Sequence, residues 1–474
     1  MNTKALRQKV LDLAIHGKLV PQNPNDESAT VLLEKIRAEK AEKIKKGELK
    51  ADKKDSFIFV GSDKRHYEQF ADGTVKDIED EIPFDVPEEW AWCRLNELAD
   101  IARGGSPRPI ENYITDSPDG INWIKIGDTA PESKYIESAK EKIKPEGQKH
   151  SRFVHEGDFL LTNSMSFGRP YILKINGCIH DGWLVFANIK ECVIKDYLYY
   201  ALSSDYIYAS FSMVAAGSTV KNLKSDTVKQ VLFPLPPIKT QETIVEAIEK
   251  SFSQIDILDN EKLDLQTAIK QTKSKILDLA IHGKLVPQDP NDEPAEELLK
   301  RIATSDNRPY EKVELSEIDW TLPNNWCLCH FGDIATVING KNQSKVENTN
   351  GKYPIYGSGG IMGRADDYIC PENCTIIGRK GSINNPIFVE EKFWNVDTAF
   401  GLSPSEAVLP RFLFYFCEYF DFTTLDSSTT LPSLTKTNIQ QIIFALPPIE
   451  EQKRILDKTN ELFRKLDEIV LNLI

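Results

Sequence analysis

Between residues 241 and 279, two sets of positions, each spaced by seven residues, are occupied mostly by Ile and Leu. One set reads Gln241, Ile248, Ile255, Lys262, Ile269 and Ile276, and the other reads Ile244, Ser251, Leu258, Leu265, Thr272 and Leu279. A heptad pattern without an internal Pro is typical of one long helix with an apolar seam. At ~1.5 Å per residue this helix would be roughly 60 Å long. Gly283 and Pro287 are expected to end it.

The two ends of the chain resemble the two parts of this central helix. Residues 1–20 match its last part, and the C-terminal tail matches its first part and continues the seam through Ile455, Leu462, Leu466, Ile469 and Leu473. Joining tail to head would rebuild nearly the whole helix, which indicates a circular internal repeat. We therefore expect the central helix to pair antiparallel with the combined terminal helices about a pseudo-twofold axis. Two independent coiled coils that bind other proteins are the alternative.

Three segments occur twice, in the same order. LDLAIHGKLVPQNPNDE from Leu11 recurs from Leu277 with one change, Asn23 for Asp289. VPEEWAWCRLNELADI, with Trp90, is matched by LPNNWCLCHFGDIATV, with Trp326, and FPLPPIKTQETIVEAIEKSF is matched by FALPPIEEQKRILDKTNELF. The intervening residues 92–232 and 328–443 share little obvious sequence. A duplication of two long units explains this pattern, with constant segments that hold variable ones.

The variable segments predict mixed secondary structure. Runs such as INWIKIGD, GDFLLTN, CTIIGRK and NPIFVEE are typical of strands, and KDYLYYALSSD and LPRFLFYFCEYF are typical of helices. The predicted fold class is α/β, with two mixed α/β domains joined by two long antiparallel, coiled-coil-like helices. The expected divisions are residues 1–25 (N-terminal helical repeat), 26–85 (Lys-rich linker or helical insertion), 86–236 (first domain), 237–290 (central helix), 291–318 (linker), 319–447 (second domain) and 448–474 (C-terminal helix).

Composition limits the choice of partners only weakly. The net charge of −14 argues mildly against nucleic acid. Basic and acidic residues balance between residues 94 and 229, however, whereas residues 238–300 are clearly acidic, so the total does not exclude DNA binding. No apolar run approaches the ~20 residues of a membrane helix. The N-terminus lacks a secretory signal and the eight Cys form no regular framework, so we expect a cytoplasmic protein.

Motifs for catalysis are missing. The chain has no GxxxxGK[ST] loop, no GxGxxG that opens a helix after a strand, and no Asp/Asn-Pro-Pro-aromatic run of an amino-methyltransferase. Cys327, Cys329, Cys370 and Cys374 could supply four zinc ligands, but their spacings are atypical and Cys is often simply buried, so no metal is expected. His16 and His282 lie at a helix end in the repeated phrase, where capping or packing is expected rather than catalysis.

The whole plan resembles the specificity subunit of type I restriction-modification systems. The resemblance rests on the repeated LDLAIHGKLVPQ phrase, the repeated LPPIxxQ start of a helix, the two dissimilar segments, and family-like runs such as NGKNQSKVENTNGKYPIYGSGGIMG and FWNVDTAFGL. It spans essentially the full chain. It implies a DNA-recognition scaffold without catalysis or a cofactor of its own, in which two target-recognition domains each read one half of a split site and the helices set the gap.

The resemblance also implies partners. Two methyltransferase subunits would dock on the helical region and methylate adenine at N6 with S-adenosylmethionine, and motor-nuclease subunits would join to cut unmethylated double-stranded DNA. The Lys-rich segment at residues 34–54 departs from the pattern of the family. It could be a variation of the linker, a phosphate contact or a docking surface. The alternatives are a protein-only helical adaptor and an enzyme with an unrecognised nuclease or methyltransferase site.

Loops rich in Gly, Ser, Asn, Lys and Arg suit DNA, because Arg and Lys read guanine or bind phosphate and Asn and Gln read adenine. In the first variable segment and its lead-in to LPPI, the candidates are Ser106, Arg108, Ser164, Ser166, Arg169, Ser218, Lys221, Asn222 and Lys224. In the second they are Lys341, Asn342, Gln343, Lys345, Arg379, Lys380, Ser382, Asn384, Asn385, Thr430, Ser433 and Lys436. The alternative for each is an idle solvated side chain or a turn residue.

Overall fold

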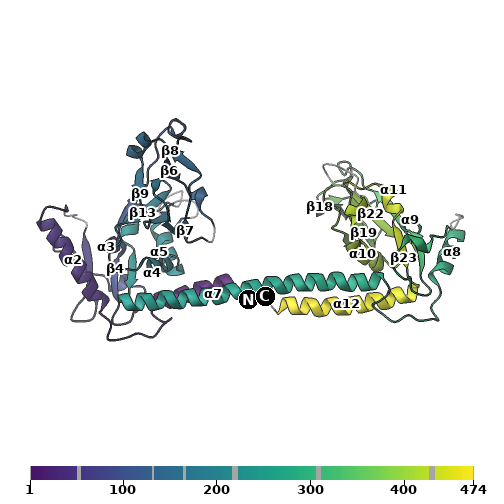
Figure 1. Cartoon of the computed structure of the whole chain (residues 1–474), viewed down its shortest axis with the longest axis horizontal. Helices are drawn as coiled ribbons and strands as arrows, with labels where there is room; N and C mark the ends of the chain where they lie inside the picture. Colours follow the sequence, from purple (N-terminus) through teal and green to yellow (C-terminus); the bar gives the residue numbers. More distant parts are fainter. Residues whose placement is uncertain are drawn as a thin grey trace. The chain divides into compact units, whose positions relative to one another are not determined.

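The computed structural model describes residues 2–50, 55–130, 133–163, 167–215, 222–305, 311–425 and 433–472. The chain forms two compact units, Met1–Asn260 and Glu261–Ile474. The boundary between them falls within the 44-residue helix α7 (Ile238–Ile281), which is the long helix that the heptad pattern predicts (Figure 1). Among the described residues, no helix combines the length and the apolar character that crossing a bilayer requires.

In unit 1, helix α1 (Thr3–Ile15) packs antiparallel on the first part of α7. Arg7 forms an ion pair with Asp256 and lies over the ring of Phe252. Beyond the end of α1, Asp26 accepts a 3.2 Å hydrogen bond from Thr240 Oγ1, near the start of α7. The seam residues meet in one buried cluster, which includes Val10, Leu11, Ala14, Ile15, Ile244 and Ile248.

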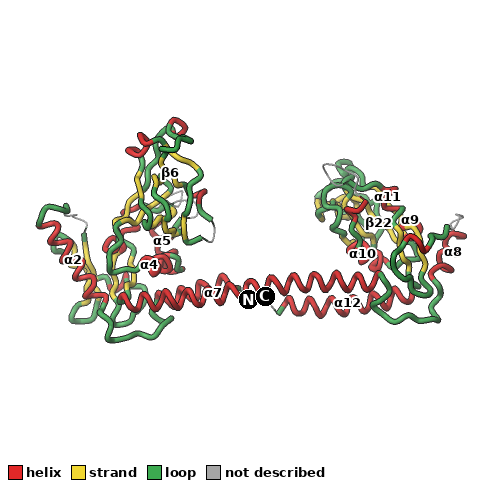
Figure 2. The backbone as a smooth tube through the Cα atoms, in the orientation of Figure 1, coloured by secondary structure: helices red, strands yellow, loops and turns green. Residues whose placement is uncertain are grey.

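In unit 2, helix α12 (Ile449–Leu471) packs antiparallel on the second part of α7, and the two helices lie side by side (Figure 2). Lys273 Nζ lies 2.6 Å from Asp467 Oδ1 and over the ring of Phe463. Gln288, beyond the end of α7, donates a 2.7 Å hydrogen bond to Glu451 near the start of α12. The predicted antiparallel pairing is therefore present within each unit.

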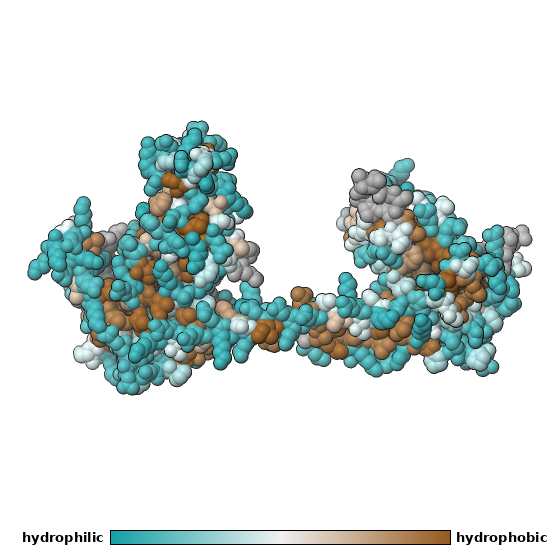
Figure 3. Space-filling model, in the orientation of Figure 1, coloured by the Kyte–Doolittle hydropathy of each residue, from teal (hydrophilic) through white to brown (hydrophobic). Residues whose placement is uncertain are grey.

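The middle of α7 differs from the prediction. Leu258 and Leu265, which the heptad pattern assigns to the seam, are 40% and 36% exposed, and Leu263 is 61% exposed. Arg7 of α1 reaches Asp256 and Asp259, on either side of Leu258, and still leaves that side chain exposed. Apolar side chains also show at the surface along α7 and α12 in unit 2 (Figure 3).

The first head is inserted between two short strands that pair with each other, β4 (Ala91–Arg94) and β14 (Leu232–Leu235). Its sheets have the orders β5-β13-β10-β11-β7 and β8-β6-β12-β9. The strands are β5 (Asp100–Arg103), β6 (Ile121–Ile124), β7 (Tyr135–Ile136), β8 (Glu141–Ile143), β9 (Arg152–Val154), β10 (Phe159–Thr162), β11 (Pro170–Leu173), β12 (Gly177–Ile179) and β13 (Trp183–Ala187). The helices are α3 (Leu95–Leu98), α4 (Lys195–Leu202), α5 (Asp205–Ala215) and α6 (Ser225–Lys229).

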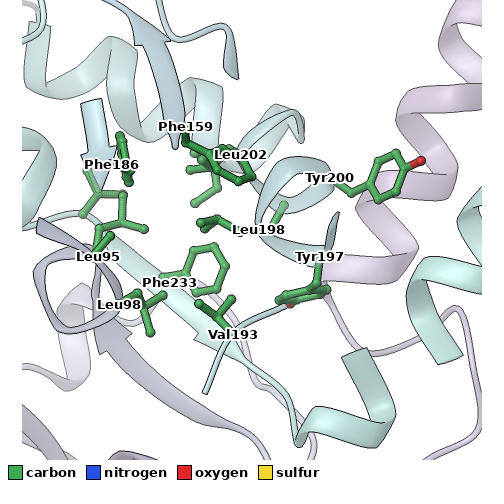
Figure 4. Close-up of a cluster of buried hydrophobic side chains, with 14 of the residues drawn as sticks. Leu95, Leu98, Phe159, Phe186, Val193, Tyr197, Leu198, Tyr200, Leu202 and Phe233 are labelled. Carbon is green, nitrogen blue, oxygen red and sulfur yellow. The ribbon is translucent and has the colours of Figure 1, made fainter. Parts of the chain in front are cut away.

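Apolar burial joins this head to the helix pair of unit 1. Phe159 and Phe186 from the five-stranded sheet, Leu198 from α4 and Phe233 from β14 gather in one cluster (Figure 4), and none is more than 1% exposed. The cluster continues into α1 and α7. Each such side chain contributes about 1.5–3 kcal/mol by burial, so the head and its helices share a core.

The second head lies between β15 (Cys327–His330) and β23 (Ile443–Leu446), which pair in the same way. Its sheets have the orders β16-β22-β19-β20 and β18-β17-β21. The strands are β16 (Ala335–Asn339), β17 (Tyr353–Gly357), β18 (Gly360–Ala365), β19 (Cys374–Gly378), β20 (Ile387–Val389), β21 (Trp394–Asn395) and β22 (Ala399–Pro404). The helices of this unit besides α7 and α12 are α8 (Ala295–Ser305), α9 (Phe331–Ile334), α10 (Pro410–Tyr419) and α11 (Lys436–Gln440).

The two heads repeat one strand arrangement although their sequences differ. The order β16-β22-β19-β20 corresponds to β5-β13-β10-β11, and β18-β17-β21 corresponds to β8-β6-β12. In both heads the pair in the smaller sheet, β17 with β21 and β6 with β12, is parallel. The internal repeat therefore extends into the segments that look unrelated in sequence. We call the shared arrangement the head frame.

The repeated phrase attaches each head to its helix. Gly17 and Gly283 follow α1 and α7 with φ of 66° and 64°, a left-handed conformation that favours Gly. A Cβ on Gly283 would lie 2.5 Å from Pro323 Cγ and 3.0 Å from the Trp326 ring, and Gly17 faces Pro87 and Trp90 equivalently. We call each of these Gly turns, together with the Trp that it faces, the neck of the head. The phrase thus recurs because both necks need the same tight turn beneath the same Trp.

The repeated His and Gln residues also play matched structural parts. His16 and His282 donate from Nδ1 to the backbone oxygens of Asp12 and Asp278, each at 2.7 Å. Gln241 donates to Cys192 O and Pro236 O and accepts from Ile194 N. Gln452 donates to Ala407 O and Pro447 O and accepts from Leu409 N. Each Gln ties its head to the helix that follows LPPI.

Residues 29–82 form more than the linker or helical insertion expected from the sequence. Helix α2 (Ala29–Lys45) is followed by an antiparallel sheet of β1 (Ser56–Val60), β2 (His66–Phe70) and β3 (Val75–Asp77). Glu68, 2% exposed, accepts hydrogen bonds of 2.6 Å from both Arg94 of β4 and Ser56. Loss of one partner of a buried pair destabilises strongly, so this sheet is anchored to β4. The strands of the sheet are short, with five, five and three residues, and β2 and β3 are largely polar, so little in the sequence indicated a sheet.

The Cys residues lie in apolar surroundings. Cys327 and Cys329 belong to one buried cluster of unit 2, and Cys370 and Cys374 belong to another. Burial raises the pKa of Cys327 to about 12 and that of Cys374 to about 11. Thiols that resist ionisation are poor metal ligands. Among the described residues, no three His, Cys, Asp or Glu side chains are grouped to hold a metal ion.

Candidate nucleic-acid interface

At one edge of the second head, the ends of β16 and β19 meet the start of β22. Gly340 N, just after β16, donates to Ala399 O at 3.2 Å, and Arg379 N, just after β19, donates to Thr398 O at 2.8 Å. Leu434 N then donates to Arg379 O at 2.9 Å. Three loops that are far apart in the sequence are therefore held together. We call this the strand-end edge of the head.

The first head carries the same set of backbone hydrogen bonds. Gly104 N, just after β5, donates to Trp183 O at 2.9 Å. Asn163 N, just after β10, donates to Gly182 O at 2.9 Å, and Leu223 N donates to Asn163 O at 2.8 Å. Each bond has its counterpart in the second head, so both strand-end edges have one backbone design. The side chains that they carry are different.

One Gly in each edge makes this approach possible. A Cβ on Gly340 would lie 1.8 Å from Val396 O, and a Cβ on Gly104 would lie 2.2 Å from His180 O. Any side chain there would push the first loop away from the strand opposite. The two Gly residues are therefore required by backbone proximity, in the same place of the head frame.

The second edge gathers several of the predicted DNA-binding residues. Lys341 is exposed and its backbone N donates to Asn395 O at 3.0 Å. Arg379 and Lys380 are exposed at the end of β19, and Lys380 forms an isolated β-bridge with Ser433. Three cations from two loops therefore stand at one edge. In the loop after Lys341, Asn342 and Lys345 are exposed and Gln343 is half-buried.

The other candidates in the second head are more mixed. Ser382 and Asn385 are exposed in the loop after β19. Asn384 donates to Asp421 Oδ1 at 2.5 Å and accepts from Phe422 N at 2.8 Å, so its amide is already engaged within the head. Hydrogen bonds from Thr423 and Asn384 hold the pKa of Asp421 below its ordinary value. Lys436 is exposed at the start of α11, and Thr430 lies outside the described residues.

Asp181 organises the edge of the first head. Its carboxylate accepts hydrogen bonds from Ser106 Oγ at 3.0 Å and from Arg108 at 3.1 Å, and its backbone oxygen accepts from Arg103 at 2.9 Å. Partial burial opposes ionisation of Asp181, but the Ser106 hydrogen bond and the charges of His180 and Arg103 outweigh it and hold its pKa below the ordinary value. Two predicted residues, Ser106 and Arg108, are thus brought together by an acid that sequence reasoning missed.

The remaining first-head candidates are only partly placed. Arg169 is exposed beyond β10, where its backbone N donates to Thr162 Oγ1 at 2.9 Å. Lys224 is exposed just before α6, and Asn222 is half-buried next to it. The predicted residues Ser164, Ser166, Ser218 and Lys221 lie outside the described residues.

A cavity of about 780 Å³ opens at the first edge. Its lining includes Arg108, Trp123, Lys125, Glu141, His180 and Asp181. Burial lowers the pKa of His180 from its ordinary value. Donors, acceptors and a ring therefore surround one recess, a combination suited to base edges.

Asp397 in the second head holds the place that Asp181 holds in the first. Asp181 lies two residues before β13, and Asp397 lies two residues before β22. The Asp397 backbone oxygen accepts from the Arg379 side chain at 3.5 Å, and that of Asp181 accepts at 2.8 Å from the side chain of Asn163, the residue equivalent to Arg379. The signal was in the sequence, since CIHDGWLVF and WNVDTAFGL both place Asp two residues before an apolar strand. The shared position of the two Asp residues was hidden because the residues around Asp181 and Asp397 differ.

Comparison with known proteins gives one consistent result. The chain is 24% identical to the Type I restriction enzyme EcoAI specificity subunit of Escherichia coli, over 98% of this chain and 90% of that protein. It is 28% identical to the EcoEI specificity subunit of the same species, over 70% of this chain and 61% of that one. A solved structure from a study of type I restriction-modification assembly matches with a TM-score of 0.53 and 18% identity, over 82% of this chain and 94% of the other.

The family model described as "Type I restriction modification DNA specificity domain" matches twice, at residues 87–267 and 323–472. Each match holds one head together with helical sequence that follows it, as the duplication predicts. The family is non-catalytic. Matches that cover more than half of the chain establish membership, and the chain belongs to the type I restriction-modification DNA specificity family.

Proposed function

We propose that each head reads one half of a bipartite double-stranded DNA site through its strand-end edge. The observation that carries this proposal is the repeated edge, where one set of backbone hydrogen bonds holds two different sets of loops. Because phosphate contacts set the position of a protein on DNA, edges with the same backbone arrangement would place both heads on the duplex in the same way. Different side chains would select different bases, because base-edge contacts set sequence.

The charges of the two edges suit this role. Lys341, Arg379 and Lys380 offer positive charge to phosphates or to guanine at the second edge. At the first edge Arg108 is 79% exposed in its side chain yet held by Asp181. An Arg that is oriented by a carboxylate loses less freedom on binding than a free one. Local charge thus favours DNA although the chain as a whole is acidic.

We infer that the helices serve as spacer and docking surface. The pairs α1–α7 and α7–α12 would set the gap between the half-sites, and two methyltransferase subunits would bind along them. Exposed apolar side chains on these helices, Leu258, Leu263, Leu265 and Ile469, support a protein partner there. S-adenosylmethionine would bind to the methyltransferase subunits, which methylate adenine at N6, and motor-nuclease subunits would complete a restriction complex. Cellular DNA as the substrate places this function in the cytoplasm.

The test is base-resolution methylation sequencing. Cells that express this chain with its neighbouring methyltransferase are compared with cells that lack only this chain. A split motif with N6-methyladenine that depends on this chain is the expected result, and it gives both half-sites and the gap. If the complex assembles and no motif appears, the proposal fails in favour of a protein-only adaptor.

A further inference from the structure

The second head exposes two large apolar side chains at the tip of a hairpin. Strands β17 and β18 pair antiparallel and are joined through Ser358 and Gly359. Ile361 and Met362, at the start of β18, are 66% and 62% exposed. Single exposed apolar side chains are common. Here two neighbours, both within three residues of the turn, leave apolar surface exposed at the end of a tight hairpin.

This hairpin tip stands beside the strand-end edge. Val396 N donates to Tyr356 O at 2.9 Å, which ties β17 to the segment just before β22. A Cβ on Gly378 would lie 3.2 Å from Ser358 Cβ, so the tip touches the end of β19. The next residues along the chain are Arg379 and Lys380, both exposed. The apolar tip is therefore flanked by cations.

The first head has a polar surface at the same place of the head frame. Strands β6 and β8 correspond to β17 and β18, and the registers equate Glu141 with Gly363. The segment just before β8, which holds Ala139 and Lys140, therefore takes the place of the start of β18. Lys140 Nζ donates to Gly127 O at 2.9 Å. The shared frame thus presents a polar surface in one head and an apolar one in the other.

We propose that Ile361 and Met362 read the 5-methyl group of a thymine in the half-site of the second head. This inference rests on the proposed function. A two-stranded β-ribbon fits the major groove, where the thymine methyl is the one apolar mark of a base pair. The flanking cations would hold the phosphates beside the tip. Ile361 and Met362 are accordingly specificity-determining residues without a polar contact.

The experiment removes the methyl group alone. The assembled methyltransferase complex is titrated with duplexes of its sequenced site in which each thymine in turn is replaced by deoxyuridine. We expect at least one replacement, confined to one half-site, to weaken binding by about fourfold, which corresponds to the ~0.8 kcal/mol of one buried methyl group. No effect at any thymine, or a half-site pair without thymine, would overturn the inference.

A matched variant tests the residues. In the double variant Ile361→Ser with Met362→Ser, the complex should no longer distinguish thymine from deoxyuridine at that position, and the other half-site should bind as before. Leu315→Ser is the control, because Leu315 is 61% exposed in the same unit and lies in the segment before the head, outside the strand-end edge. Discrimination that survives in the double variant would overturn the inference. A wild-type complex that binds no specific site would instead overturn the proposed function.

Discussion

Gln452 offers a direct test of how each head is fastened to its helix. Its side chain is fully buried. It accepts from Leu409 N at 2.8 Å and donates to Ala407 O and Pro447 O at 3.0 Å each. Gln452→Ala removes three hydrogen bonds at ~1 kcal/mol each and leaves the partners without replacement. We expect the unfolding free energy of unit 2 to fall by about 3 kcal/mol or slightly more.

Hydrogen exchange measures this loss locally. Amides of α10 and of the start of α12 should exchange about 100-fold faster, because ~1.4 kcal/mol corresponds to a factor of ten. Amides near Ile194 in unit 1 should be unchanged, since Gln241 holds them. Gln241→Ala should produce the reverse pattern, and the exposed Gln441 provides a control with little effect. If Gln452→Ala accelerates exchange by less than about fivefold, or accelerates it equally in both units, the reasoning that each Gln fastens its own head to its helix is refuted.

Four further predictions concern the edges, the necks and the helix. Lys380→Ala should lower the slope of log K against log salt by about 0.9 for the assembled complex, and an unchanged slope would exclude a phosphate contact. Asp181→Asn should relax one half-site in the sequenced motif, because the charge that holds Arg108 is lost; relaxation of both halves would contradict this. Gly283→Ala should destabilise unit 2 by about 2–4 kcal/mol in chemical denaturation, through its left-handed φ and the Pro323 contact. Gly47→Ala, with positive φ and open space, should lose only about 1–2 kcal/mol, and equal losses would count against the neck contact. Seven residues inserted in the middle of α7 should lengthen the gap and leave both half-sites intact, whereas altered half-sites with the same gap would reject the spacer role.

Much of the helical frame was predictable because its signals are local or repeated. Ile248 and Ile255 of one heptad set and Ile244 of the other were assigned to the seam, and the structure buries all three. The matching ends of the chain predicted antiparallel pairing, which is confirmed within each unit. The heptad pattern was wrong for Leu258 and Leu265, because spacing identifies an apolar stripe and does not tell how far a partner buries each side chain of that stripe.

The candidate site was predictable only in part. Loop composition pointed to Arg108, Lys341, Arg379 and Lys380, and all four lie at a strand-end edge. Asp181 was missed, because the residues around it differ from those around Asp397 and hide the position that the two Asp residues share. Its importance arises from Ser106 and Arg108, which reach it across some 75 residues of chain.

By itself, the sequence determined the duplication, the long helix, the tight Gly turn of each neck and the family to which the chain belongs. These follow from periodicity and repetition, which depend on near neighbours and need no knowledge of distant contacts. Only the tertiary structure decided that the two dissimilar inserts share one head frame and one strand-end edge. Backbone hydrogen bonds such as Leu223 to Asn163 and Leu434 to Arg379 define that edge. Because backbone groups are the same for every residue type, this likeness leaves almost no trace in the side chains.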